Sequence, residues 1–123
     1  MNTYIVDKAW GREVIFADEP EYCGKLLQFD RKGNKFSMHF HNNKSETWYV
    51  SKGSFLLSVI NTLNAEVSHK TLAEGDTWTN NTLVPHQLEA LEDYSEIIEV
   101  STHDDPMDNY RVMPGDSQNK LVK

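Results

Sequence analysis

Short stretches in which apolar and polar side chains alternate constrain this chain more than any other feature of its sequence. No window of helical length keeps apolar residues at i, i+3, i+4 and i+7, the spacing of an amphipathic helix. Alternation with a period of two indicates β-strands instead, and turn residues such as Lys52-Gly53 separate the stretches. We therefore expect strands at residues 13–17, 24–29, 35–40, 47–50, 54–60, 66–72, 77–79, 86–91 and 96–101.

Many short strands joined by close turns are typical of a closed barrel or a two-sheet sandwich. The 123 residues suffice for one hydrophobic core with one interior site. We expect an all-β chain that forms a single domain over residues 1–123. Its barrel core would cover about residues 10–102, followed by a tail, 103–123, that is rich in Asp, Pro, Asn and Gly.

Charge and composition exclude several classes of function. Lys and Arg total 12 against 19 Asp and Glu, a net charge of −7, which disfavours nucleic-acid binding because phosphate contacts come mainly from basic side chains. The single cysteine, Cys23, allows no intrachain disulfide and suits a reducing cytoplasm. No apolar run approaches the roughly 20 residues that span a bilayer, and the N-terminus does not resemble a signal peptide. We expect a cytoplasmic protein with no membrane or nucleic-acid partner.

Three histidines and one carboxylate form the candidate site. On a strand, His39 and His41 project from the same side. The turn at residues 42–45 lets the next strand return beside the first, which brings Glu46 within reach of both rings. Downstream, His86 shares a face with Leu88 and Ala90, and in a closed barrel it can face the same interior point. Taken alone, the His-x-His pair could equally lie on an exposed strand with both rings in solvent.

This donor set suits one divalent transition metal. Three neutral imidazoles and a carboxylate are compatible with Zn, Mn, Fe, Ni or Co, and the missing thiolate argues against a purely structural zinc site. An octahedral ion held by four such ligands keeps two positions for water, substrate or oxygen.

Residues 33–53 resemble the first cupin motif, G-x5-H-x-H-x4-E-x6-G, at every defined position. The second motif, G-x5-P-x-G-x2-H-x3-N, aligns on Gly75 and His86 with its spacing intact. Its remaining defined positions, Pro, Gly and Asn, are occupied here by Asn81, Leu83 and Ala90.

The resemblance spans about residues 10–111. It implies a double-stranded β-helix, or jelly-roll, cupin barrel, with the metal ligands His39, His41, Glu46 and His86 inside its mouth.

A narrower resemblance links the chain to mannose-6-phosphate isomerase-type cupins. The matching segments are Trp10-Gly11, Lys25, 37–41, 46–50, Pro85-His86, 98–101 and 108–111. This resemblance implies a sugar or sugar-phosphate ligand, with Lys25 and Arg111 as candidate contacts for an anionic group. The residues themselves leave other roles open, because Lys25 could face water and Arg111 could pair with Asp108.

The leading hypothesis is a metal-dependent sugar or sugar-phosphate isomerase that works through an enediolate. Glu46 is the first candidate for the base, with Glu99 or Glu89 as substitutes. One alternative is an Fe, Mn or Ni oxygenase or lyase that acts on a small acid. Another is a non-catalytic sugar-binding module.

The remaining histidines and aromatic residues have simpler interpretations. We expect His69 to face solvent and His103 to help order the tail. Core or barrel-wall positions are predicted for Trp48, Tyr49, Phe55, Leu57 and Trp78. Edge strands near the N-terminus can pair with a second copy, so we also expect a homodimer.

Overall fold

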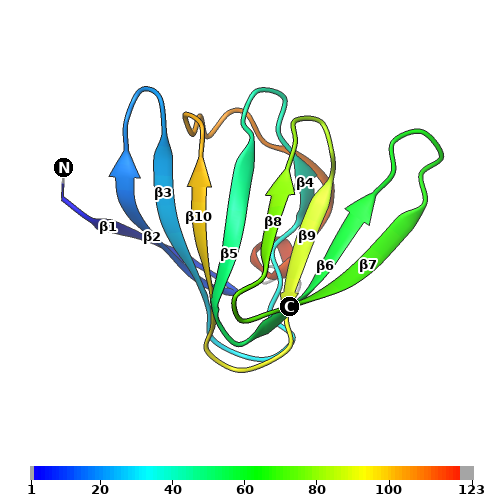
Figure 1. The fold of residues 1–123 in the computed structure, drawn as a ribbon, viewed down its shortest axis with the longest axis horizontal. Helices are drawn as coiled ribbons and strands as arrows, with labels where there is room; N and C mark the ends of the chain where they lie inside the picture. Colours follow the sequence, from blue (N-terminus) through cyan, green and yellow to red (C-terminus); the bar gives the residue numbers. More distant parts are fainter. Residues whose placement is uncertain (1, 120–123) are drawn as a thin grey trace.

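The computed structural model describes residues 2–119 and consists of two antiparallel β-sheets that face each other (Figure 1). One sheet has the strand order β1-β2-β3-β10-β5-β8 and the other β11-β4-β9-β6-β7. The strands are β1 (Tyr4–Lys8), β2 (Gly11–Asp18), β3 (Cys23–Phe29), β4 (Met38–Phe40), β5 (Glu46–Lys52), β6 (Ser54–Ile60), β7 (Val67–Ala73), β8 (Thr77–Asn80), β9 (His86–Ala90), β10 (Ser95–Ser101) and β11 (Tyr110–Met113). This interleaved order is that of a jelly roll, which confirms the predicted all-β fold class.

Each predicted strand has a counterpart in the structure, although the ends differ. The largest difference is at residues 35–40, where only β4 is a strand and Lys35 forms an isolated bridge to Glu89. Two strands, β1 and β11, were not predicted, and both lie outside residues 10–102. Nearly all of their side chains are exposed, so their sequences lack the alternation that marks a half-buried strand.

A hydrophobic core fills the space between the sheets. Trp48, Phe55 and Leu57 are fully buried in it, and Trp78 packs against it, as predicted. Tyr49 lies in the wall strand β5 but does not fill the core, because the residue is 46% exposed. Neighbouring residues on a strand point to opposite faces, so a buried Trp48 forces Tyr49 outward.

The inward-facing positions change from apolar to polar toward one end of the barrel. On four strands the buried side chains follow this change: Leu27 to Lys25 on β3, Trp48 to Glu46 on β5, Leu88 to His86 on β9, and Ile97 to Glu99 on β10. Because Glu99 pairs in register with both Lys25 and Trp48, the polar ends of these strands lie together. The register therefore builds a polar compartment above an apolar core.

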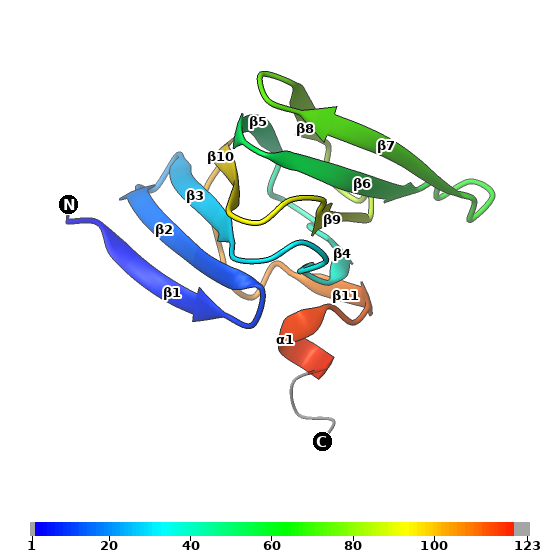
Figure 2. The same cartoon turned by 90° about the horizontal axis from the view of Figure 1, so that it is seen from below.

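The C-terminal segment completes the wall of this compartment. β11 pairs with β4, and the short helix α1 (Asp116–Asn119) follows it at the same edge of the five-stranded sheet (Figure 2). The Asp116 carboxylate accepts hydrogen bonds from the Asn34 side chain and the Lys35 backbone. In the part of the chain that the structure describes, no helix has the length and apolar character needed to cross a bilayer.

Candidate metal centre

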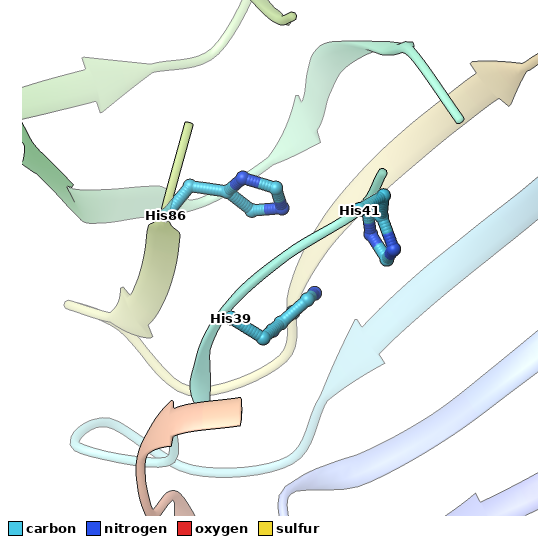
Figure 3. Close-up of side chains that lie close together, drawn as sticks. All are labelled: His39, His41 and His86. Atoms are coloured by element: carbon cyan, nitrogen blue, oxygen red, sulfur yellow. The ribbon is translucent and has the colours of Figure 1, made fainter. Parts of the chain in front are cut away.

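Three imidazole rings from two neighbouring strands meet in the polar compartment. His39 lies in β4 and pairs in register with His86 at the start of β9, while His41 directly follows β4. One ring nitrogen of each histidine lies within 4.8 Å of those of the other two. Figure 3 shows the rings turned toward a common space. The alternative that the His-x-His pair faces solvent does not hold, because His39 is half-buried and His41 is buried.

Each ring is held by its Nδ1 atom against a backbone carbonyl oxygen. The three acceptors are Ser37 for His39 at 2.7 Å, Asp108 for His41 at 2.7 Å, and Val84 for His86 at 2.9 Å. A carbonyl oxygen can only accept, so Nδ1 carries the proton in each pair. In the neutral ring the lone pair is then on Nε2, as a metal ligand requires.

Burial keeps two of the rings neutral. It lowers the pKa of His39 to about 3, and it also lowers the pKa of His86, despite the nearby Glu46 carboxylate. For His41, burial acts in the same direction, but Glu46 and the Asp108 carbonyl outweigh it and raise the pKa. A metal ion would have to displace any proton on His41, so metal affinity should fall in acid.

The Glu46 carboxylate completes the donor set. Its Oε1 atom lies 3.3 Å from His41 Nε2, and its Oε2 atom lies 3.7 Å from His86 Nε2. The Asn80 side chain donates a hydrogen bond to Oε2 at 3.3 Å. Burial opposes ionisation of Glu46, but His41 and the Lys44 ammonium group hold its pKa well below the usual range. Glu46 is therefore a carboxylate at neutral pH.

Two atoms of this cluster suit a cation directly. Among the described residues, Glu46 Oε1 and His86 Nε2 are buried without a hydrogen-bond partner. A buried ring nitrogen such as His86 Nε2 that is left unpaired costs about 1–3 kcal/mol, and coordination of a metal would remove that cost. The residues therefore fit a divalent transition metal, held by three imidazoles and one carboxylate.

A cavity of about 340 Å³ opens beside the cluster. Lys25 and Arg111, the two predicted substrate contacts, both line it. Glu99 lines it as well, whereas Glu89 lies on the other face of β9 from the buried His86, Leu88 and Ala90. Of the two substitute bases, only Glu99 is thus placed to act in this cavity.

Both simpler interpretations of the basic residues fail. Lys25 does not face water, because its residue is only 7% exposed and its Nζ lies 2.9 Å from the Asp104 carboxylate. Within residues 2–119, Arg111 forms no ion pair with Asp108. The Asp108 carboxylate instead accepts hydrogen bonds from three successive backbone N–H groups, those of Asn42, Asn43 and Lys44.

Lys44 was not among the predicted site residues and was interpreted only as part of the turn at residues 42–45. The residue is 5% exposed, and its Nζ lies 3.0 Å from Asp104 and 3.6 Å from both Glu46 and Glu99. Its position between His41 and Glu46 in the sequence was the available indication that it belongs to the site. The Glu99 carboxyl also accepts a hydrogen bond from Trp48 Nε1 at 2.9 Å, and burial raises its pKa.

The other two histidines lie outside the cluster. His69 is exposed on β7, as predicted, and its Nδ1 lies 2.8 Å from the Ser58 hydroxyl. His103 is exposed in the segment after β10, with its Nδ1 3.3 Å from the Glu19 carbonyl oxygen.

A jelly roll with three inward histidines and a carboxylate defines a metal-binding β-barrel protein. A family model described as Cupin matches residues 26–117, most of the chain. The chain therefore belongs to the cupin family, as its two motifs predicted.

Solved structures show the same fold. KdgF from Halomonas sp. is 24% identical with a TM-score of 0.68, over 78% of this chain and 82% of that one. Oxalate decarboxylase from Bacillus subtilis is 18% identical (TM-score 0.77), and the capsular polysaccharide assembling protein CapF from Staphylococcus aureus is 16% identical (TM-score 0.78). The matches cover 90% and 92% of this chain but only 30% and 33% of those proteins. No curated protein sequence matches this chain.

Proposed function

We propose that this protein is a metal-dependent isomerase of a sugar or sugar phosphate. The observation that carries the proposal is the position of Glu99. Glu99 lines the same cavity as His39 and His41, and Lys44 Nζ lies 3.6 Å from both Glu99 and Glu46. A proton-transfer group thus lies next to the candidate metal ligands.

His39, His41, His86 and Glu46 would hold the ion. A divalent metal bound there supplies a Lewis acid, which polarises the substrate carbonyl and stabilises the negative charge of the enediolate. Because Glu46 is ionised and directed at two imidazoles, it suits the role of ligand better than that of base. This shifts the proposed base from Glu46 to Glu99.

Glu99 would move the proton between neighbouring carbons. As a carboxylate it would accept the proton from the substrate carbon, and as a carboxylic acid it would return it to the adjacent carbon, while the substrate hydroxyl proton passes to the former carbonyl oxygen. A pKa raised by burial brings the two forms closer in energy at neutral pH. The hydrogen bond from Trp48 fixes the side chain orientation during both steps. Lys25 and Arg111 would contact anionic oxygens of the substrate.

The test combines metal analysis with solvent exchange. After the metal content is measured, the loaded protein is incubated with D-mannose 6-phosphate in D₂O. We expect a ketose product that carries deuterium at the carbon to which the base returns the proton. Glu99→Gln should lower kcat by about 100-fold or more with the metal retained, whereas Glu89→Gln should be silent.

Full metal loading with neither turnover nor exchange across a sugar and sugar-phosphate panel would contradict the isomerase. Thermal stabilisation by the same compounds without product would point instead to a non-catalytic sugar-binding module.

The two buried lysines favour a second candidate, an oxygenase or lyase that acts on a small acid. One of the structures with this fold is an oxalate decarboxylase, although at 18% identity the likeness concerns the fold alone. Oxygen consumption, or activity that requires a redox-active Fe or Mn, would support this candidate. Isomerase activity with zinc in the absence of oxygen would exclude it.

We further propose a single-domain homodimer in a reducing compartment such as the cytoplasm. β1 forms an edge of the six-stranded sheet and exposes Tyr4 and Ile5, which suits pairing with a second copy. Light scattering after gel filtration should give twice the chain mass for the wild type. Ile5→Lys should shift it toward the monomer, and a monomeric wild type would contradict the dimer.

A further inference from the structure

One carboxylate bridges the two buried lysines of the cavity. It belongs to Asp104, in the segment of residues 102–109 that joins β10 to β11 and is called the strap below. Asp104 Oδ2 lies 2.9 Å from Lys25 Nζ, and Oδ1 lies 3.0 Å from Lys44 Nζ. Each oxygen therefore contacts a different ammonium group, an arrangement that any carboxylate or phosphate could reproduce.

Both lysines are held in place by the structure around them. Lys25 lies within β3, between β2 and β10 in the sheet. Lys44 is fixed by its backbone N–H, which donates to Asp108, and by the Glu46 and Glu99 carboxylates around its Nζ. The pair of ammonium groups is thus a preorganised site for two oxygens.

Asp104, in contrast, lies in an exposed stretch of the chain, and in this stretch its side chain is the part that contacts the two lysines. His103, Asp105, Pro106 and Met107 are exposed, and the Asp104 side chain is itself 24% exposed. The strap is anchored at one end by the Thr102 N–H, which donates to the Ser45 carbonyl oxygen, and at the other by Asp108. Asp104 lies between these anchors, so its side chain can leave the lysines while the Asp108 carbonyl still holds His41.

The charges around the lysines leave room for one exchangeable anion. Four carboxylates, from Glu13, Glu46, Glu99 and Asp104, face the two ammonium groups in this network. The four negative charges exceed the two positive ones by two, and a divalent ion at the histidine cluster would balance this excess. With Asp104 turned away, one positive charge would then be left for an incoming anion. Although burial opposes it, the lysines hold the pKa of Asp104 at about 2, so the competitor stays charged at neutral pH.

We infer that Lys25 and Lys44 form an oxyanion subsite, which the strap residue Asp104 occupies in this structure and which a carboxylate or phosphate of the ligand takes over on binding. Asp104 is then a built-in competitor that the ligand must displace. The inference rests on the proposed function only in placing the ligand in this cavity, and it names the charge class of that ligand.

The test measures binding of three probes by titration calorimetry, in zinc-loaded and in chelator-treated protein. D-mannose 6-phosphate supplies a phosphate, D-glucuronate a carboxylate, and D-mannose no charge. Asp104→Asn should bind the charged probe that fits about tenfold more tightly than the wild type, because the ionic competitor is gone. The affinity for D-mannose should not change. The charged probe whose affinity increases identifies the oxyanion as a phosphate or a carboxylate.

Asp105→Asn is the matched control. It removes the same charge from the same strap, but its carboxylate accepts a hydrogen bond from the Met107 N–H instead of pairing with a lysine. We expect its affinities to stay within about twofold of the wild type. Lys44→Gln in the Asp104→Asn background should abolish the gain, and near-UV circular dichroism checks that each variant is folded.

A lower melting temperature for Asp104→Asn with no gain in affinity for either charged probe would show a purely structural ion pair and overturn the inference. An equal gain in Asp105→Asn would overturn it too, because the effect would then be general electrostatics. These outcomes are separable from the isomerase assay. Absent turnover refutes the enzyme and leaves a selective Asp104→Asn gain standing, whereas turnover without that gain refutes only the subsite.

Discussion

The two segments that carry the histidines differ in how closely they follow the family pattern, yet they deliver equivalent ligands. Residues 33–53 match the first cupin motif throughout, while residues 75–90 depart from the second at three positions. Nevertheless, the ring of His86 is held as those of His39 and His41 are, by Nδ1 against a carbonyl oxygen. Ligand geometry thus depends on the strand register and this backbone contact, and it tolerates changes in the turn residues.

Two of the departing positions contact the first segment through backbone groups. The Leu83 N–H donates to the His41 carbonyl oxygen at 2.7 Å, and the Ala90 N–H donates to the Asn34 carbonyl oxygen at 2.8 Å. The Ala90 carbonyl in turn accepts from the Gly33 N–H at 2.8 Å. Backbone hydrogen bonds survive most substitutions, which explains how the second segment can change its side chains and keep its place.

The largest expected effect comes from removing one histidine from each segment in turn. His39→Ala and His86→Ala should each weaken zinc binding by at least about 100-fold, the upper end of what loss of an outer-sphere partner costs. Competition with a chromophoric chelator measures the affinity, and His69→Ala, on an exposed strand, is the control. A much smaller loss for His86→Ala would mean that the second segment is only a scaffold, and the equivalence would fail.

A pH titration of the metal-free protein tests whether both segments bury neutral rings. The pKa values of His39 and His86 are lowered in the folded state, so below about pH 6.5 the unfolded chain binds more protons than the folded protein. The free energy of unfolding must therefore decrease as the pH is lowered. The slope should approach about 1.4 kcal/mol per pH unit for each ring, partly offset by His41, whose raised pKa acts in the opposite direction.

Urea unfolding between pH 7.5 and 4.5 measures this dependence. His86→Gln should reduce the slope. A flat profile would show that the rings are protonated or exposed in the folded protein.

The third prediction concerns Asp108, which supports the first of the two segments through contacts to residues 41–44. Asp108→Ala removes the acceptor of three backbone N–H groups at residues 42–44 and should destabilise the protein by about 2 kcal/mol. Zinc affinity should fall about tenfold, because the carbonyl that orients His41 loses its fixed position. Chemical denaturation and chelator competition check both values, with Asp105→Ala as the control. Unchanged zinc affinity would show that His41 does not need this support.

The smallest expected effect is a gain at Leu83. This residue has φ +69° where the family motif has glycine, and a left-handed conformation costs a non-glycine residue about 1–2 kcal/mol. Leu83→Gly should therefore stabilise the protein by up to about 1 kcal/mol, since the greater freedom of glycine in the unfolded chain offsets part of the relief. Leu63→Gly, at an exposed residue of another turn without this strain, should be neutral or destabilising in the same thermal-unfolding assay.

Alternation predicted the strands and the inner faces that carry His39, His41 and His86, because it is a property of consecutive residues. Alternation placed His39, in β4, and His41, just after it, on one side of this segment, and the same rule put His86, Leu88 and Ala90 on the inner face of β9. The edge strands β1 and β11 were not predicted because nearly all of their residues are exposed, so their sequences show no alternation of apolar and polar side chains. β11 is placed by hydrogen bonds to β4, which is distant in the sequence, whereas β1 pairs with the adjacent β2 and lacks only the alternation that would mark it.

The sequence by itself determined an all-β jelly roll of the cupin family and the residues that can bind a metal, because side-chain alternation and motif spacing are properties of consecutive residues. Only the tertiary structure decided that Lys44 is buried, that Asp104 bridges it to Lys25, and that Glu99 rather than Glu89 lines the cavity. Burial and ion pairing depend on which side chains from distant segments share a compartment with little water, and the strand register settles that.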